Sequence, residues 1–188
     1  SRLIVLNGGG LEAWSGNLKK NIDAGQTTII EASAEIRPTN IDPHVWLDPR
    51  LAQKMVNKIT QGFEQVDSLN KDYYKANANA LKSKLNSLDI AYEQGLANCA
   101  EKNIITSHAA FGYLAAAYGF KQIPITGLSP DAEPSPAELA NIVKFAKANK
   151  IKYIFFENLA SPKLAQTIAA EISAETLMLN PLEGLSNE

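Results

Sequence analysis

The stretch NIITSHAAFGY, residues 103–113, predicts a buried strand, a polar turn and the start of a helix. Two isoleucines and a threonine give its first part the β-branched composition that favours strands. The small and apolar residues that follow suit a helix, which Gly119 would close. His108 stands in the turn between them. Turns that follow parallel strands gather at the sheet edge where ligands bind, so we expect His108 in a ligand-binding region.

The same alternation continues to the C-terminal end. Further strands are predicted at residues 122–126, 152–157 and 176–179, and helices at residues 109–118, from the capping box SPAE at 135–138, and after Ser161-Pro162. Strands that alternate with helices indicate an α/β unit with a parallel sheet whose faces helices cover. The loops at 127–136 and 157–161 would then lie on the same edge as His108.

Upstream, strands are predicted at residues 3–6 and 27–30, with a glycine loop at 8–10 and a helix from residue 11. Asp48 as N-cap and Pro49 at the first helical position predict a helix to Val66. A second helical pattern covers residues 71–98, about 40 Å at 1.5 Å per residue. We therefore expect an α/β fold of two β/α lobes, an incomplete one at 1–70 and a nearly complete one at 99–188, joined by a long rigid helix at 71–98.

Composition excludes several kinds of partner. A net charge of −2 with no basic stripe argues against nucleic acid, and no apolar run approaches the roughly 20 residues that cross a bilayer. Cys99 is the only cysteine, so an intrachain disulfide and a thiolate cluster are both excluded. A metal site in this chain must use imidazole nitrogen and oxygen ligands.

The other histidine, His44, lies in DPHVWLDP at residues 42–49, where two prolines stiffen the backbone around it. The residues alone leave two interpretations open. The histidines are ligands of one metal ion, or they are polar side chains satisfied by nearby backbone groups. Zinc favours imidazole but takes four ligands, or three and a water, so two histidines are not enough. Tight zinc binding by these residues would require Asp42, Asp48, Glu157 or a partner chain to complete the coordination.

The sequence offers no catalytic constellation and no cofactor-binding motif. Ser107 is merely the neighbour of His108, and a Gly-x-Ser-x-Gly elbow is absent from the sequence. The glycine loop lacks the spacing of a phosphate-binding loop. A zinc hydrolase is the enzymatic alternative, and it would need an open coordination position beside a general base.

Five blocks carry a family resemblance: NGGGLEAW at 7–14, DPHVWLDP at 42–49, SHAAFGY at 107–113, GLSPDAEPSP at 127–136 and NPLEGL at 180–185. In this order and spacing, the chain resembles the metal-binding solute-binding proteins of ABC transporters, the zinc-, manganese- and adhesin-type family. The resemblance implies two β/α lobes joined by a rigid helix, with a metal ion held between the lobes and no enzymatic activity.

The resemblance also implies the ligands. By motif match, His44 corresponds to a metal ligand from the first lobe and His108 to one from the second. A histidine at the second position resembles zinc-type members, so Zn²⁺ is the expected transported ligand and Mn²⁺ the alternative. Family members supply a further histidine, expected upstream of Leu3, and an aspartate, expected downstream of Glu188. We therefore expect a chain truncated at both ends, with an incomplete site.

These expectations describe a periplasmic or cell-surface receptor that captures zinc and delivers it to an ABC transporter permease in the membrane, with its leader outside these residues. A manganese receptor of the same family is the first alternative. A metal-independent adhesion or interaction protein is the second, and the zinc hydrolase is the third.

Overall fold

The computed structural model describes residues 1–36, 42–158 and 161–184, and the chain divides into two compact units, Ser1–Gly95 and Leu96–Glu188. Each unit contains a parallel sheet and helices, so the predicted α/β class is confirmed. The division falls at the C-terminal end of the long helix, which therefore counts almost wholly with the first unit. Whether that helix acts as a separate link between lobes at 1–70 and 99–188 stays a prediction.

The first unit is built on a two-stranded parallel sheet of β1 (Leu3–Leu6) and β2 (Thr28–Glu31). Helix α1 (Ser15–Asn21) connects the strands, and α2 (Pro49–Val66) lies against the sheet. A Cβ atom on Gly62 of α2 would lie 2.8 Å from Cδ1 of Ile30, so glycine lets this helix approach the sheet closely.

Helix α1 begins four residues later than predicted, at Ser15. The reason lies in Glu12, whose carboxylate accepts hydrogen bonds from the backbone N–H groups of Asn7 and Gly8, at 2.6 and 3.0 Å. These bonds hold the segment after β1 in a turn, so the helix cannot start there.

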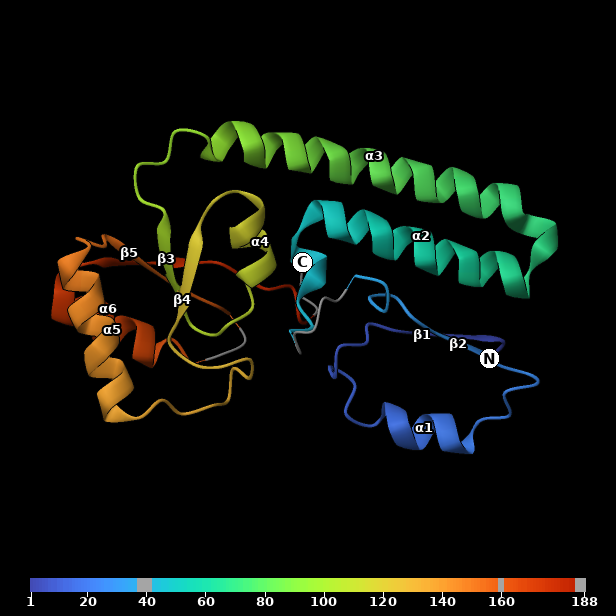
Figure 1. The fold of residues 1–188 in the computed structure, drawn as a ribbon, viewed down its shortest axis with the longest axis horizontal. Helices are drawn as coiled ribbons and strands as arrows, with labels where there is room; N and C mark the ends of the chain where they lie inside the picture. The colour runs from blue at the N-terminus through green and yellow to red at the C-terminus, as the bar shows by residue number, and fades with distance from the viewer. Residues whose placement is uncertain (37–41, 159–160, 185–188) are drawn as a thin grey trace. The chain divides into compact units, whose positions relative to one another are not determined.

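Helix α3 (Lys71–Leu96) lies beside α2 in the same unit, as Figure 1 shows, and the short 3-10 helix η2 (Ser68–Asn70) connects them. The rings of Phe63 and Tyr74 stack at 5.0 Å between centroids near this corner. Further along, Nζ of Lys82 donates to Oδ1 of Asn57 at 3.0 Å. The long helix predicted at 71–98 is thus present, and it is one arm of a helical hairpin.

The second unit contains a four-stranded parallel sheet in the order β4-β3-β5-β6. The strands are β3 (Asn103–Thr106), β4 (Lys121–Pro124), β5 (Tyr153–Phe156) and β6 (Glu175–Met178), and the helices are α4 (Gly112–Ala117), α5 (Pro136–Ala148) and α6 (Lys163–Ile172). Ile105 and Ile154, on the two central strands, belong to one buried core with Ala146 of α5 and Ile168 of α6. Burial of these apolar side chains holds the helices on the sheet.

In this unit, local sequence signals predict the start of α5 correctly but not the start of α4. The predicted capping box is present at α5, where Ser135 Oγ accepts from the N–H of Glu138 at 3.3 Å and the Glu138 carboxylate accepts from the N–H of Ser135 at 2.7 Å. Helix α4, predicted from residue 109, begins at Gly112. There the N–H of Ala109 donates to the carbonyl of Gly127 and so serves a contact between loops rather than a helix.

Candidate metal centre

His44 is held by a carboxylate two residues before it. Oδ1 of Asp42 lies 2.6 Å from Nδ1 of the ring and also accepts the backbone N–H of His44 at 3.0 Å. An ionised carboxylate can only accept hydrogen bonds, so Nδ1 carries the proton and the ring's lone pair lies on Nε2. The side chain of His44 is 2% exposed. The turn therefore holds the imidazole of His44 in one orientation.

The glycine loop after β1 contacts the turn that carries His44. The side-chain amide of Asn7 donates to the carbonyl of Pro43 at 3.1 Å. Gly9 has φ +76°, and a Cβ atom there would lie 3.0 Å from Cα of Pro43. The loop was predicted as a tight turn, and it also brings the backbone into close contact with the residue before His44.

The C-terminal part of the block 42–49 is also held in place. Val45 is fully buried, and the rings of Trp46 and His44 lie 5.3 Å apart between centroids. Asp48 caps α2 by accepting the N–H of Arg50 at 2.8 Å, with Pro49 at the start of the helix as predicted. Because capping occupies the Asp48 carboxylate, Asp48 is a poorer candidate for a metal ligand than the sequence alone suggested.

In the second unit, three loops that follow β3, β5 and β6 bring His108, Glu157 and Glu183 together. Nδ1 of His108 lies 2.7 Å from Oε1 of Glu157, and Nε2 lies 3.3 Å from Oε1 of Glu183. His108 and Glu157 are 1% and 3% exposed, whereas the side chain of Glu183 is 21% exposed. The sheet edge predicted to bind ligands therefore holds an imidazole between two carboxylates.

The backbone of His108 is also fixed. Its carbonyl accepts a hydrogen bond from Oγ1 of Thr106 at 2.8 Å and another from Nε2 of Gln122 at 2.9 Å. The neighbouring loops are joined by the N–H of Asn158, which donates to Oδ1 of Asn180 at 2.9 Å. These bonds hold the backbone of the loops from which the three side chains extend.

The charges around His108 raise its pKa. Burial is the largest single influence and pulls the pKa of His108 down, but the hydrogen bond and charge of Glu157, with those of Glu183, together outweigh it. The pKa of His108 is therefore higher than its ordinary value of about 6.5. A metal ion that binds this imidazole must displace a proton more firmly held than usual.

Both predicted ligands, His44 and His108, are thus buried and held against a carboxylate, one in each unit. Glu183 was not among the predicted ligands, because the carboxylate was sought downstream of Glu188. A signal was present in the sequence, since Glu183 lies in the block NPLEGL directly after a predicted strand. Glu157 was considered as an oxygen donor, and it lies on the Nδ1 side of His108.

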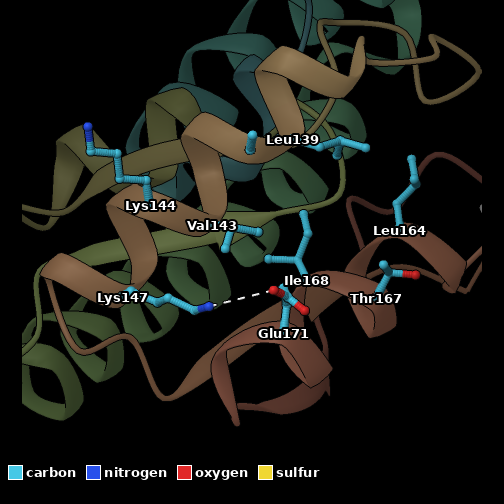
Figure 2. Close-up of a pocket in the computed structure, with 9 residues that line it drawn as sticks. Leu139, Val143, Lys144, Lys147, Leu164, Thr167, Ile168 and Glu171 are labelled. Carbon is cyan, nitrogen blue, oxygen red and sulfur yellow. Dashed lines mark ion pairs between the residues drawn. The ribbon is translucent and has the colours of Figure 1, made fainter.

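A groove of about 480 Å³ lies between α5 and α6 in the second unit (Figure 2). Val143 and Ile168 point into it, and an ion pair between Lys147 and Glu171, 3.6 Å long, crosses its end. Its lining contains neither histidine nor cysteine, so it does not resemble a zinc site. Among the described residues, no helix is both long and apolar enough to cross a membrane.

Comparisons with known proteins find similarity to zinc-uptake and zinc-binding proteins. Residues 1–188 match the family model described as zinc-uptake complex component A, periplasmic. The high-affinity zinc uptake system protein ZnuA of Bacillus subtilis is 42% identical over 205 residues, which cover 99% of this chain and 64% of that protein. The zinc-binding lipoprotein AdcA of Streptococcus pneumoniae is 50% identical over 153 residues, 78% of this chain and 29% of that protein. The chain therefore spans less than two thirds of these relatives.

A solved structure is also closely similar. The laminin-binding protein Lmb of Streptococcus agalactiae, described as a bifunctional protein with adhesin and metal transporting activity, superposes with a TM-score of 0.92 at 35% identity. The match covers 100% of this chain and 73% of that chain.

Proposed function

This chain belongs to the family of periplasmic zinc-uptake components, and from that membership we propose that its protein captures Zn²⁺ outside the cytoplasm and delivers it to an ABC transporter permease. The family consists of binding components rather than enzymes, so the zinc-hydrolase alternative is dropped. The observation that carries the proposal is His108, a buried imidazole whose two nitrogens each face a carboxylate.

In this proposal His44 and His108 ligate one ion through Nε2, and Glu183 supplies an oxygen ligand. Imidazole nitrogen and carboxylate oxygen are both ordinary zinc ligands. The set of three leaves a fourth position for a water or for a residue outside these 188. The support for Nε2 is that Asp42 and Glu157 lie on the Nδ1 sides of the two rings.

The choice of zinc over manganese rests on ligand chemistry and on the relatives. Two imidazoles favour zinc, whereas manganese prefers a larger share of oxygen ligands. The two curated relatives described above are named for zinc. The location outside the cytoplasm rests on the family description and on the name of the lipoprotein relative.

A calorimetric titration of the full-length protein with Zn²⁺ and Mn²⁺ at neutral pH tests this function. We expect tight zinc binding, weaker manganese binding, and a loss of at least tenfold in zinc affinity, about 1.4 kcal/mol, in His44→Ala and in His108→Ala. Glu171→Gln, an exposed change on α6, should bind zinc as the unchanged protein does. Absence of tight transition-metal binding would contradict the proposal.

A second function, adhesion, is favoured by one observation, the close structural similarity to the laminin-binding protein of Streptococcus agalactiae. Binding of the full-length protein to immobilised laminin, with and without a zinc chelator, tests it. Binding that survives chelation would support adhesion independent of metal capture, and absence of binding in both conditions would remove this candidate.

A further inference from the structure

Glu157 is a buried carboxylate with no role as a ligand in the set proposed above. It follows the central strand β5, is 3% exposed, and lies 2.7 Å from Nδ1 of His108. We propose that Glu157 is a positioning residue, which holds His108 with Nδ1 protonated and Nε2 presented to the metal ion. The inference rests on the proposed function, because it assigns a role at the same site.

The two carboxylates at His108 lie on different nitrogens, and this separates their roles. Glu183 faces Nε2 at 3.3 Å, and its side chain keeps 21% exposure, so a metal ion on Nε2 would meet it. Glu157 occupies Nδ1. A metal ion could not bind Nδ1 without displacing this carboxylate, which accepts the proton there. Glu157 therefore acts through the imidazole and Glu183 acts on the ion.

The bond to Glu157 restrains the ring itself, whereas the backbone bonds of His108 restrain only its main chain. Thr106 and Gln122 hold the carbonyl of His108, at 2.8 and 2.9 Å, but neither bond restrains rotation about the side-chain bonds. The bond to Glu157 adds the restraint at the far end of the side chain. A carboxylate that accepts from the second nitrogen of a ligating histidine fixes the tautomer and raises the basicity of the metal-binding nitrogen.

His44 provides an independent parallel within the other unit. There Asp42 takes the same position on Nδ1 at 2.6 Å, although it comes from the same turn and not from a neighbouring strand. Two unrelated local structures thus produce the same arrangement of carboxylate and imidazole. A bond made only to satisfy a buried histidine would not need a carboxylate in both places, since a backbone carbonyl would serve.

The test uses Glu157→Gln in the full-length protein, with Glu171→Gln as the matched control on exposed α6. Three measurements are made: the tautomer of His108 by ¹⁵N nuclear magnetic resonance on metal-free protein at alkaline pH, zinc affinity by competition with a chromophoric chelator, and the visible spectrum of the Co²⁺-loaded protein. Circular dichroism establishes that each variant is folded. Glu157→Asp, which keeps the charge on a shorter side chain, replaces Glu157→Gln if the latter does not fold.

We expect the unchanged protein to hold His108 with the proton on Nδ1. Glu157→Gln should bind zinc about 10- to 100-fold more weakly, while its cobalt spectrum keeps the same coordination number. A proton on Nε2 in the unchanged protein, or zinc affinity within twofold of it in Glu157→Gln, would overturn the inference. A lower coordination number in Glu157→Gln would also overturn it, because Glu157 would then be a ligand. Failure of the unchanged protein to bind zinc would instead refute the proposed function, and the tautomer would still decide whether Glu157 orients the ring.

Discussion

Oδ1 of Asp42 binds His44 twice, at 2.6 Å from Nδ1 of the ring and at 3.0 Å from the backbone nitrogen. One carboxylate oxygen thereby links the orientation of the side chain to the conformation of the turn that carries it. The consequence is that Nε2 of His44, the nitrogen proposed to bind the metal ion, is placed before any ion arrives, so that less ordering is needed upon binding.

Asp42→Asn should therefore weaken zinc binding about 10- to 100-fold, because an amide is a weaker acceptor and no longer imposes one tautomer on the ring. The measurement is a chelator competition with the full-length protein. Asp131→Asn, in the exposed loop after β4, is the control and should not change the affinity. Equal affinities for Asp42→Asn and the unchanged protein would show that the turn holds His44 without this bond.

Glu183→Ala should lower zinc affinity at least tenfold, about 1.4 kcal/mol, because water would replace a charged oxygen ligand. X-ray absorption at the zinc edge should show that both imidazoles remain bound. Glu133→Ala removes a carboxylate from the proline-rich loop at 127–136 and should leave binding unchanged. A large loss in Glu133→Ala would mean that this loop, rather than Glu183, supplies the oxygen ligand.

Zinc affinity should fall as pH falls, and for His108 the loss should begin above the ordinary histidine range. Its pKa is raised by Glu157 and Glu183 against the opposing effect of burial, so protons compete with zinc at higher pH than usual. Below the pKa of a ligand histidine, each unit by which the pH falls should raise Kd about tenfold for each proton that zinc must displace. Zinc titrations between about pH 5.5 and 8.5, a window that includes the ordinary histidine pKa, measure this slope. A Kd that does not change across that range would contradict it.

In the metal-free protein, the contribution of His108 to stability should fall as the pH rises. A folded-state pKa above the unfolded value means that protonated His108 stabilises the fold below about pH 6.5. This contribution is lost as the pH rises through the raised pKa. Thermal melts with and without zinc should therefore diverge as pH rises, and His108→Gln should remove this part of the pH dependence from the metal-free melts.

Gly9→Ala should destabilise the first unit and weaken zinc binding together. The new Cβ would lie 3.0 Å from Cα of Pro43, and the φ of +76° is strained for alanine by about 1–2 kcal/mol. Gly10→Ala is the matched control, because Gly10 has φ +87° but, apart from its chain neighbours, no residue has an atom within 4 Å of the new Cβ. Both variants should lower the thermal midpoint, and only Gly9→Ala should also weaken zinc binding, since it alone displaces the turn of His44.

The sequence by itself determined the features that depend on neighbouring residues. Strand β3, the start of α2 at Pro49 and the capping box of α5 all lie where local composition and cap chemistry predict them. Both proposed ligand histidines were identified from their motifs, and Asp42 belongs to the same short block as His44. The bond between Asp42 and His44 joins residues two apart in a turn and is a local property, although the motif alone did not predict it.

Only the tertiary structure decided which loops meet at His108. The order β4-β3-β5-β6 places β5 beside β3 and β6 beside β5, so that Glu157 and Glu183 approach the imidazole from 49 and 75 positions away. Strand order in a parallel sheet is set by the packing of helices on its faces, and alternation in the sequence does not encode it. The late start of α4 has the same origin, because the N–H of Ala109 donates to the carbonyl of Gly127 in a distant loop. The late start of α1 is a local effect, because the Glu12 carboxylate accepts from the N–H groups of Asn7 and Gly8.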